Sequence, residues 1–280
     1  MNPHPDSLAC TDLDSCVQHL GQQGLAVLDH AGLARLTAQA ETTAATEPTA
    51  GDVCAVSAAL AALNPLWDDL PPDAHLKDGG RYRQRRHASL VQRVDLRADS
   101  ADALVLASPR AHWQPTTYNA LHGGMLRWFA PVDERMSGSP TWRALVFEIG
   151  RLFARVRAPQ DGHWYIEAHP FRITTAGGVG RPTPEGAHRD GVDFVAVVMV
   201  GRHHIIGGET RVFDAAGPFG LRFTLAEPWS VLLLDDERVI HESTPIQPIE
   251  PAPGAAALPG WRDTLVLTYR SGGFQDPPPA

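Results

Sequence analysis

The stretch His188-Arg189-Asp190-Gly191-Val192-Asp193-Phe194 combines metal-ligand side chains with the start of an apolar segment that runs to Val200. Residues two apart on an extended strand project to the same side, so His188 and Asp190 can bind one ion together. A third residue of suitable type, His241, follows 53 residues after His188. Two histidines and one carboxylate on one face of an octahedron are a ligand set for divalent iron. The sequence therefore predicts a metal site built from these three residues.

The chain after Trp164 has the pattern of an antiparallel β core. Short apolar or alternating segments are separated there by turns that contain glycine and proline, which is typical of jelly rolls. The predicted fold class is mostly β with α, with a double-stranded β-helix (jelly-roll, cupin-like) core in residues 161–280. Its strands are expected near residues 164–174, 192–201, 209–214, 221–226, 230–235, 239–246 and 263–270, with a short one near 203–206.

Residues 1–160 show a mixed pattern in which helices dominate. Leu13, Val17 and Leu20 recur at helical spacing. We expect the helices to pack on the outer face of the β core, so that residues 1–280 form a single domain. The expected elements are a helix from Leu13, a buried strand at 25–28 and further helices at 31–40, 53–63 and 140–156.

Composition narrows the class of protein. The formal net charge is −8, so there is no electrostatic footprint for nucleic acid. The three cysteines lack zinc spacing and are odd in number, which favours free thiols in a reducing compartment. The first residues lack the apolar segment of a signal peptide, and the apolar runs are too short to cross a bilayer. We therefore expect a cytoplasmic protein with no membrane partner; its oligomeric state stays open.

Several motifs resemble those of the 2-oxoglutarate/Fe(II)-dependent dioxygenases. They are His188-Arg189-Asp190, Gly207-Gly208-Glu209-Thr210, His241 and Arg262-Asp263-Thr264. The stretch from Pro184 to Phe194 is similar to the bacterial group that hydroxylates free L-amino acids, the isoleucine hydroxylase type. The glycine pair of the second motif is also compatible with a simple tight turn.

This resemblance implies the cofactors Fe(II), 2-oxoglutarate as cosubstrate and O2, with His188, Asp190 and His241 as ligands and catalytic residues. It also implies hydroxylation of an unactivated C–H bond of a small free L-amino acid, aliphatic or cyclic, while 2-oxoglutarate and O2 become succinate and CO2. The carboxylate of Asp190 favours hydroxylation, because the related halogenases have a small residue in its place.

The far carboxylate of 2-oxoglutarate needs a cation and a hydroxyl group. Arg262 and Thr264 share a face at the start of the last strand and resemble the Arg-x-Ser/Thr pair of the superfamily. Arg270 lies on the same face, but the strand is about 26 Å long at roughly 3.3 Å per residue, so both arginines cannot serve one carboxylate. We expect Arg262 to serve, with Arg270 as the alternative.

An amino acid substrate needs partners for its carboxylate and for its ammonium group. Arg83 lies within Arg81-Tyr82-Arg83-Gln84-Arg85-Arg86-His87, which is either a solvated edge strand or a strand near the cavity whose arginine binds the carboxylate. The expected substrate-binding residues are Arg83 or Arg172 for the carboxylate, Asp193 or Glu209 for the ammonium group, and His169 and Phe194 as further walls.

Two other functions are compatible with these motifs. The first is the same oxygenase chemistry on a larger or carrier-bound substrate. The second is a non-catalytic jelly roll that binds a small ligand or a protein. It is less favoured, because the metal ligands and the Arg-x-Thr pair are all intact.

Overall fold

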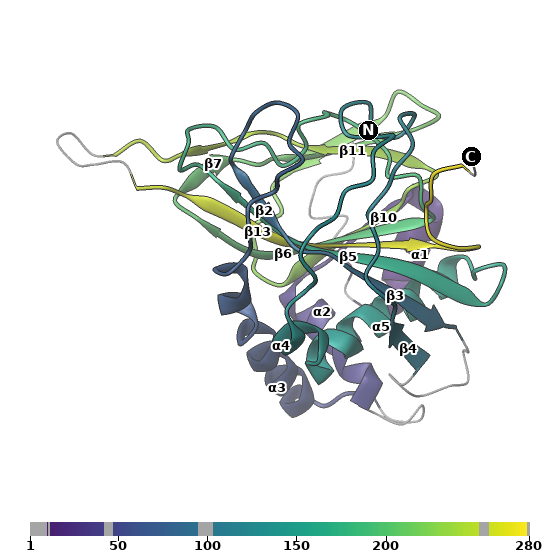
Figure 1. Ribbon diagram of the computed structural model, residues 1–280. Coiled ribbons are helices and arrows are strands. Elements are labelled where there is room, and N and C mark those ends of the chain that lie inside the picture. Colours follow the sequence, from purple (N-terminus) through teal and green to yellow (C-terminus); the bar gives the residue numbers. More distant parts are fainter. Residues whose placement is uncertain (1–9, 11, 42–46, 95–102, 252–257, 279–280) are drawn as a thin grey trace.

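The computed structural model describes residues 10, 12–41, 47–94, 103–251 and 258–278. A large antiparallel sheet forms its centre (Figure 1). The strands of this sheet are β1 (Leu25–Leu28), β2 (Arg83–Arg85), β3 (Ala88–Arg93), β4 (Leu104–Leu106), β5 (His163–Thr174), β6 (Phe194–His203), β10 (Ser230–Asp235) and β13 (Trp261–Arg270). They run in the order β1-β10-β6-β13-β5-β3-β4, and β2 also pairs with β5.

Smaller sheets face one side of this large sheet, above it in Figure 1. Their strands are β7 (Ile205–Gly207), β8 (Thr210–Asp214), β9 (Gly220–Phe223), β11 (Val239–Ser243) and β12 (Ile246–Pro248). One sheet has the order β11-β8-β9, and the other is the pair β12-β7. Antiparallel sheets that face each other in this way form the predicted jelly roll, so the predicted fold class is confirmed.

The helices cover the opposite side of the large sheet (Figure 1). They are α1 (Leu13–Gln23), α2 (His30–Ala38), α3 (Ala50–Ala61), α4 (Glu134–Ser137) and α5 (Pro140–Val156), with short 3-10 turns at Gln39–Glu41 and Asn64–Trp67. Helix α5 begins as its sequence predicts: Ser139 caps it by accepting a hydrogen bond from the Trp142 amide, and Pro140 occupies the first turn.

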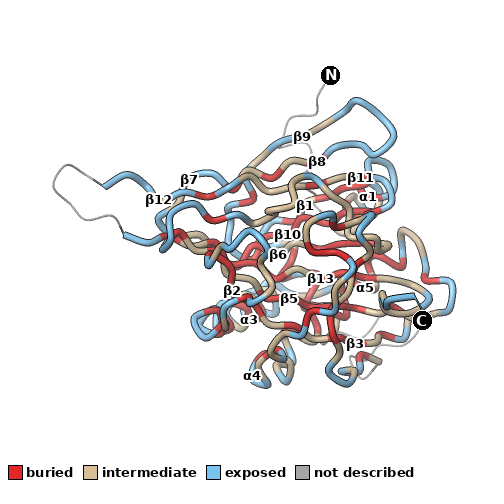
Figure 2. The backbone as a smooth tube through the Cα atoms, turned by 45° about the horizontal axis from the view of Figure 1, so that its top comes forward, coloured by how far each residue is buried: buried red, intermediate tan, exposed pale blue. Residues whose placement is uncertain are grey.

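Strand β6, the apolar run after Asp193, is covered on both faces of the large sheet. Its successive side chains point to opposite faces, and almost the whole strand is buried, as are the middle strands in Figure 2. One face joins the core under the helices and the other joins the core under the small sheet. The residues of the first face are Phe194, Ala196, Val198 and Val200, and those of the second include Val195 and Met199, packed with Val212 and Val239.

Two details differ from the expectation. Strands β3 and β4 were not identified, because polar residues such as Ser89 and Gln92 are buried in β3 and interrupt the apolar alternation. The strand predicted at 239–246 is two strands, β11 and β12, separated at Thr244-Pro245. Pro245 has no N–H to continue a ladder.

One helical stretch, Ala50–Trp67, is long and apolar enough to cross a membrane by length and composition alone. Core helices of soluble proteins pass the same test. Val56 and Leu60 of this stretch, with Leu66 and Trp67, belong to the apolar core on the helix side of the large sheet.

The packing of α5 on the sheet gives a stability prediction. Phe153 is fully buried, and its ring stacks on Phe194 with centroids 4.6 Å apart. We expect Phe153→Ala to lower the free energy of unfolding by about 3–5 kcal/mol, because it removes buried area and leaves a cavity. Urea denaturation measures this. Phe219, which is 63% exposed, supplies the control: Phe219→Ala should stay within about 0.5 kcal/mol of the parent. Equal losses of unfolding free energy in both variants would contradict the placement of Phe153 in the core.

Candidate active site

His188, Asp190 and His241 come together between the large and small sheets. The backbones of His188 and His241 form an antiparallel bridge in which each N–H donates to the carbonyl of the other, at 3.0 and 2.9 Å. Residues paired in this way project to the same side, and the two ring centroids are 4.6 Å apart. The carboxylate of Asp190 lies 3.3 Å from His241 Nε2 and 3.9 Å from His188 Nε2. The three predicted ligands thus face one point.

The ring of His188 is oriented by its other nitrogen. Nδ1 lies 2.9 Å from the carbonyl oxygen of Gly186, which can only accept, so Nδ1 carries the proton. When the ring is neutral, as a metal ligand requires, its Nε2 presents a lone pair to the side of Asp190.

Asp190 is positioned through its backbone and its side chain. The buried carboxylate of Asp236 accepts the amide N–H groups of Asp190, Gly191 and Val192 at 2.9, 2.7 and 3.1 Å. Gln114 Nε2 donates to Asp190 Oδ1 at 3.1 Å. Burial and the charge of Asp190 raise the pKa of Asp236 to about 6. Burial opposes ionisation of Asp190 too, but the hydrogen bond from His241 and the charge of His188 hold its pKa below the usual value.

Gly191 allows the turn that follows Asp190. Its φ is 77°, a left-handed conformation that favours glycine, and a Cβ there would lie 2.4 Å from the ring of Tyr118. A larger residue would therefore displace either the turn or the ring.

The triad opens onto a cavity of about 120 Å³. Alternate residues of β13 line it, among them Arg262, Thr264 and Thr268. Arg262 is 4% exposed, and its Nε has no hydrogen-bond partner in the described part of the chain. Burial and nearby Arg202 lower the pKa of Arg262 to about 10, so the guanidinium stays charged at neutral pH. The cavity therefore holds a buried cation beside a hydroxyl group, as the sequence predicts.

Arg270, the alternative to Arg262, lies elsewhere. It is at the far end of β13 and donates to the carbonyl oxygens of Gly273 and Phe274. It does not line the cavity.

The basic run enters the cavity rather than forming a solvated edge. Strand β2 pairs with β5, and its Arg83 and Arg85 are 5% and 4% exposed. Arg83 Nε forms an ion pair with Asp73 Oδ2 at 2.8 Å. Arg83 was the expected residue of this run, and the structure adds Arg85, which shares its face.

His169 lines the cavity, but Arg172 does not. The two residues are three apart on β5, so they point to opposite faces of the sheet. Arg172 forms ion pairs with Asp263 and Asp68 at 2.7 and 2.8 Å, and its guanidinium lies over the ring of Trp261. The expected carboxylate role of Arg172 is wrong for this reason.

The structure also places Asp193, Phe194 and Glu209 outside the cavity, which corrects their expected roles. Asp193 accepts hydrogen bonds from the amide and hydroxyl of Ser271. Phe194 points to the helix side of β6, where it stacks on Phe153. Glu209 follows the Gly207-Gly208 turn and forms an ion pair with Arg211 at 2.9 Å.

Other cavity residues were not identified from the sequence. They come from loops without a hydrophobic period, so no pattern signals their burial. Arg127 is 2% exposed although its neighbours Leu126 and Trp128 are 54% and 62% exposed. Glu185 belongs to the stretch that precedes His188, which was the available signal. The cavity residues that were missed include His112, Gln114, Asn119, Arg127, Thr183 and Glu185.

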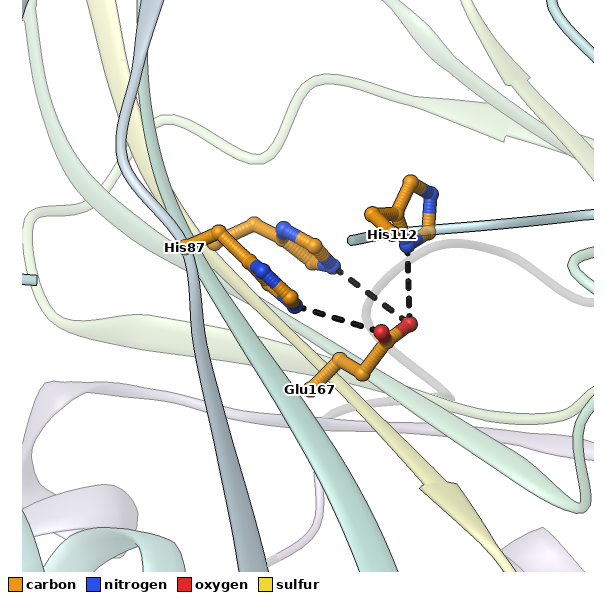
Figure 3. Close-up of side chains that lie close together, drawn as sticks. His87, His112 and Glu167 are labelled. Carbon is orange, nitrogen blue, oxygen red and sulfur yellow. Dashed lines mark hydrogen bonds and ion pairs between the residues drawn. The ribbon is translucent and has the colours of Figure 1, made fainter. Parts of the chain in front are cut away.

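A second group of ligand-type side chains includes two residues of the cavity wall, His112 and His169. Figure 3 shows His87 and His112 converging on the carboxylate of Glu167. His112 Nδ1 lies 2.9 Å from Glu167 Oε2, and His87 Nε2 lies 3.2 Å from Oε1. His169 Nε2 is 4.0 Å from Oε2. All four residues are buried and close enough to hold an ion.

Two features favour a hydrogen-bond network over a second metal centre. Arg85 Nη2 lies 2.6 Å from His169 Nδ1, and a guanidinium only donates, so His169 Nε2 carries the proton and cannot bind a metal. The positive charges of Arg85 and Arg127 also disfavour another cation here. Burial lowers the pKa of His112 to about 4. The ring of His112 is therefore a neutral donor to Glu167.

Several solved structures are similar to this chain. The chain is 56% identical to a bsmA homologue from Methylobium petroleophilum PM1, over 95% of this chain and 96% of that one, with a TM-score of 0.81. IDO from Bacillus thuringiensis shares 15% identity over 93% of this chain and 96% of its own, with a TM-score of 0.68. The Fe(II)/(alpha)ketoglutarate-dependent dioxygenase TqaL shares 17% identity over 92% and 87%, with a TM-score of 0.64.

The similarities to IDO and to TqaL show the fold alone, because both identities are low. No curated protein matches the chain. Residues 64–268, which carry the triad, Arg262 and Thr264, match the sequence model of the 2OG-Fe dioxygenases. The chain belongs to the 2OG-Fe dioxygenase family.

Proposed function

We propose that this dioxygenase hydroxylates an unactivated C–H bond of a small free L-amino acid, aliphatic or cyclic. The family uses Fe(II), 2-oxoglutarate and O2, which makes the chain an oxygenase. The observation that carries the proposal is the convergence of His188, Asp190 and His241 on the cavity that also contains Arg262. The likeness of residues 184–194 to free amino acid hydroxylases supports the substrate class. A cytoplasmic location is part of the proposal, because three free cysteines suit a reducing compartment.

The donor set fits ferrous iron. Two imidazoles and one carboxylate are its usual protein ligands in this family of sites, and His188 presents a free Nε2. Bound together, iron, 2-oxoglutarate and O2 supply the oxidising power for C–H hydroxylation, with succinate and CO2 as the other products. Asp236 and Gln114 hold the carboxylate of Asp190 in place for this role.

The same cavity contains a place for the cosubstrate. Arg262 offers an unpartnered Nε, and Thr264 a hydroxyl group on the same face, for the distal carboxylate of 2-oxoglutarate. Trp67 Nε1 donates to the backbone carbonyl of Thr264 at 3.2 Å, which anchors this part of β13 to the helix side.

The remaining wall suits an aliphatic carbon. Phe171, Ile173, Val197 and Val266 contribute apolar side chains to the cavity. They exclude water from the carbon to be oxidised and leave the C–H bond free of polar contacts.

A larger or carrier-bound substrate is the nearest alternative, because the same triad and arginine would serve it. A non-catalytic binding module is disfavoured by the intact ligand set and by the unpartnered Arg262 Nε.

Iron binding tests the triad. We expect Asp190→Ala to weaken Fe(II) binding by about 100-fold or more, since changes in the mere supports of metal ligands already cost up to about 100-fold. Anaerobic titration and iron content after dialysis measure this. The control is Glu167→Gln, which alters the second cluster and should keep one iron per chain. If Asp190→Ala retained iron, or if Glu167→Gln lost it, the iron site would be the Glu167 cluster and not the triad.

Cosubstrate affinity tests Arg262. Removing one partner of a buried charge pair costs about 2–5 kcal/mol, so Arg262→Ala should raise the KM for 2-oxoglutarate by about 30-fold or more. Arg270→Ala, which lies outside the cavity, should change it by less than about 3-fold. Steady-state succinate assays measure both, and the reverse ranking would make Arg270 the cosubstrate residue.

A substrate screen tests the reaction itself. Incubation with Fe(II), ascorbate, 2-oxoglutarate and single aliphatic or cyclic L-amino acids should give succinate and a product heavier by one oxygen atom. Mass spectrometry detects both. Product only from thioester-bound or larger substrates would support the alternative, and no succinate with any compound would support a binding module.

A further inference from the structure

Two buried guanidinium groups in the cavity have no carboxylate partner among the described residues. Arg85 and Arg127 are 4% and 2% exposed, and neither forms an ion pair with any residue that the structure describes. Arg127 Nη2 donates to the neutral amide oxygen of Gln114 at 2.9 Å. The Nε atoms of both arginines are buried without a hydrogen-bond partner.

The surroundings of Arg85 hold its charge in place without neutralising it. Its guanidinium lies between the rings of Phe129 and Phe171, 3.9 and 4.3 Å from their centroids. Its Nη2 contacts His169 Nδ1, an uncharged acceptor. Arg83, by contrast, has Asp73 at 2.8 Å.

A buried cation is costly unless it is paired. Burial, followed by the charge of Arg83, lowers the pKa of Arg127 to about 10 and also lowers the pKa of Arg85. Both groups face the same cavity. An anion that enters the cavity would therefore gain two charged donors that are already desolvated and oriented.

The cavity also offers a negative group beside the predicted metal ligands. Glu185 lines it, and its side chain is 11% exposed. Its Oε1 lies 3.7 Å from His188 Nε2, while Oε2 is buried without a hydrogen-bond partner. A cationic group near the iron ligands could bind there.

We propose that Arg85 and Arg127 bind the carboxylate of the substrate and that Glu185 binds its ammonium group. The substrate class is then an amino acid whose carboxyl and amino groups are both free. This inference rests on the proposed function and sharpens it. A thioester, ester or amide has no carboxylate, so it would leave Arg85 and Arg127 unpaired in the cavity.

The test compares each free L-amino acid of the screen with its methyl ester and its N-acetyl derivative on the unaltered protein. An active site with unpaired buried groups rejects the blocked analogue by up to about 10⁴-fold. We expect the kcat/KM of both derivatives to be lower than that of the free amino acid by about 100-fold or more. Free and blocked forms turned over equally would overturn this inference and leave the oxygenase function intact.

A variant locates the effect. Arg127→Met keeps an unbranched side chain and removes the guanidinium group with its charge. It should raise the KM for the free amino acid by about 30-fold or more. It should also reduce the ratio of kcat/KM between the free amino acid and its methyl ester, and leave iron content and the KM for 2-oxoglutarate unchanged. Glu185→Gln should instead reduce the ratio of kcat/KM between the free amino acid and its N-acetyl derivative. Arg135→Met, whose side chain is 63% exposed, is the matched control and should change none of these values.

The outcomes separate the two proposals. A rise in the KM for 2-oxoglutarate in Arg127→Met would assign this arginine to the cosubstrate and overturn the inference. The inference would also be overturned if Arg127→Met and Glu185→Gln both discriminated between free and blocked amino acids as the unaltered protein does. If 2-oxoglutarate is consumed without substrate but no amino acid in any form accelerates it, the proposed substrate class fails, and this inference fails with it.

Discussion

Two reciprocal backbone hydrogen bonds between His188 and His241 hold the candidate iron site together. They join the segment before β6 to strand β11 of the small sheet, so the two imidazoles meet only when the sheets face each other. Asp236 adds the third ligand by accepting three successive amides that begin at Asp190. Main-chain hydrogen bonds therefore orient all three ligands, and the site is organised before any ion binds.

The second constraint is the burial of charge. Alternation along β5 separates two environments: Ile166 and Ala168 point into the apolar core, while His169 and Phe171 line or approach the cavity. On the cavity side, guanidinium and carboxylate groups are desolvated together, which is tolerable only with partners. Glu167 has the rings of His87 and His112 as its partners, whereas Arg85 and Arg127 face the open space that a substrate would occupy.

The same alternation explains which of the expected substrate residues lie in the cavity. Arg83 and His169 lie in the cavity because their strands, β2 and β5, face it at those positions. Arg172 was chosen from the same strand as His169 without regard to parity, and an odd separation places it on the other face. Asp193 and Glu209 were chosen by charge alone, and each is already paired within the protein.

The sequence by itself determined the metal-ligand types, the period of the strands that carry them and the arginine at the start of β13, because these depend on spacing along one segment. Only the tertiary structure decided that Arg127 and Glu185 share a cavity with Arg85. These residues are far apart in the chain, and the loops that carry Arg127 and Glu185 have no repeating pattern. Their burial depends on long-range packing of the sheets, and no local spacing encodes it.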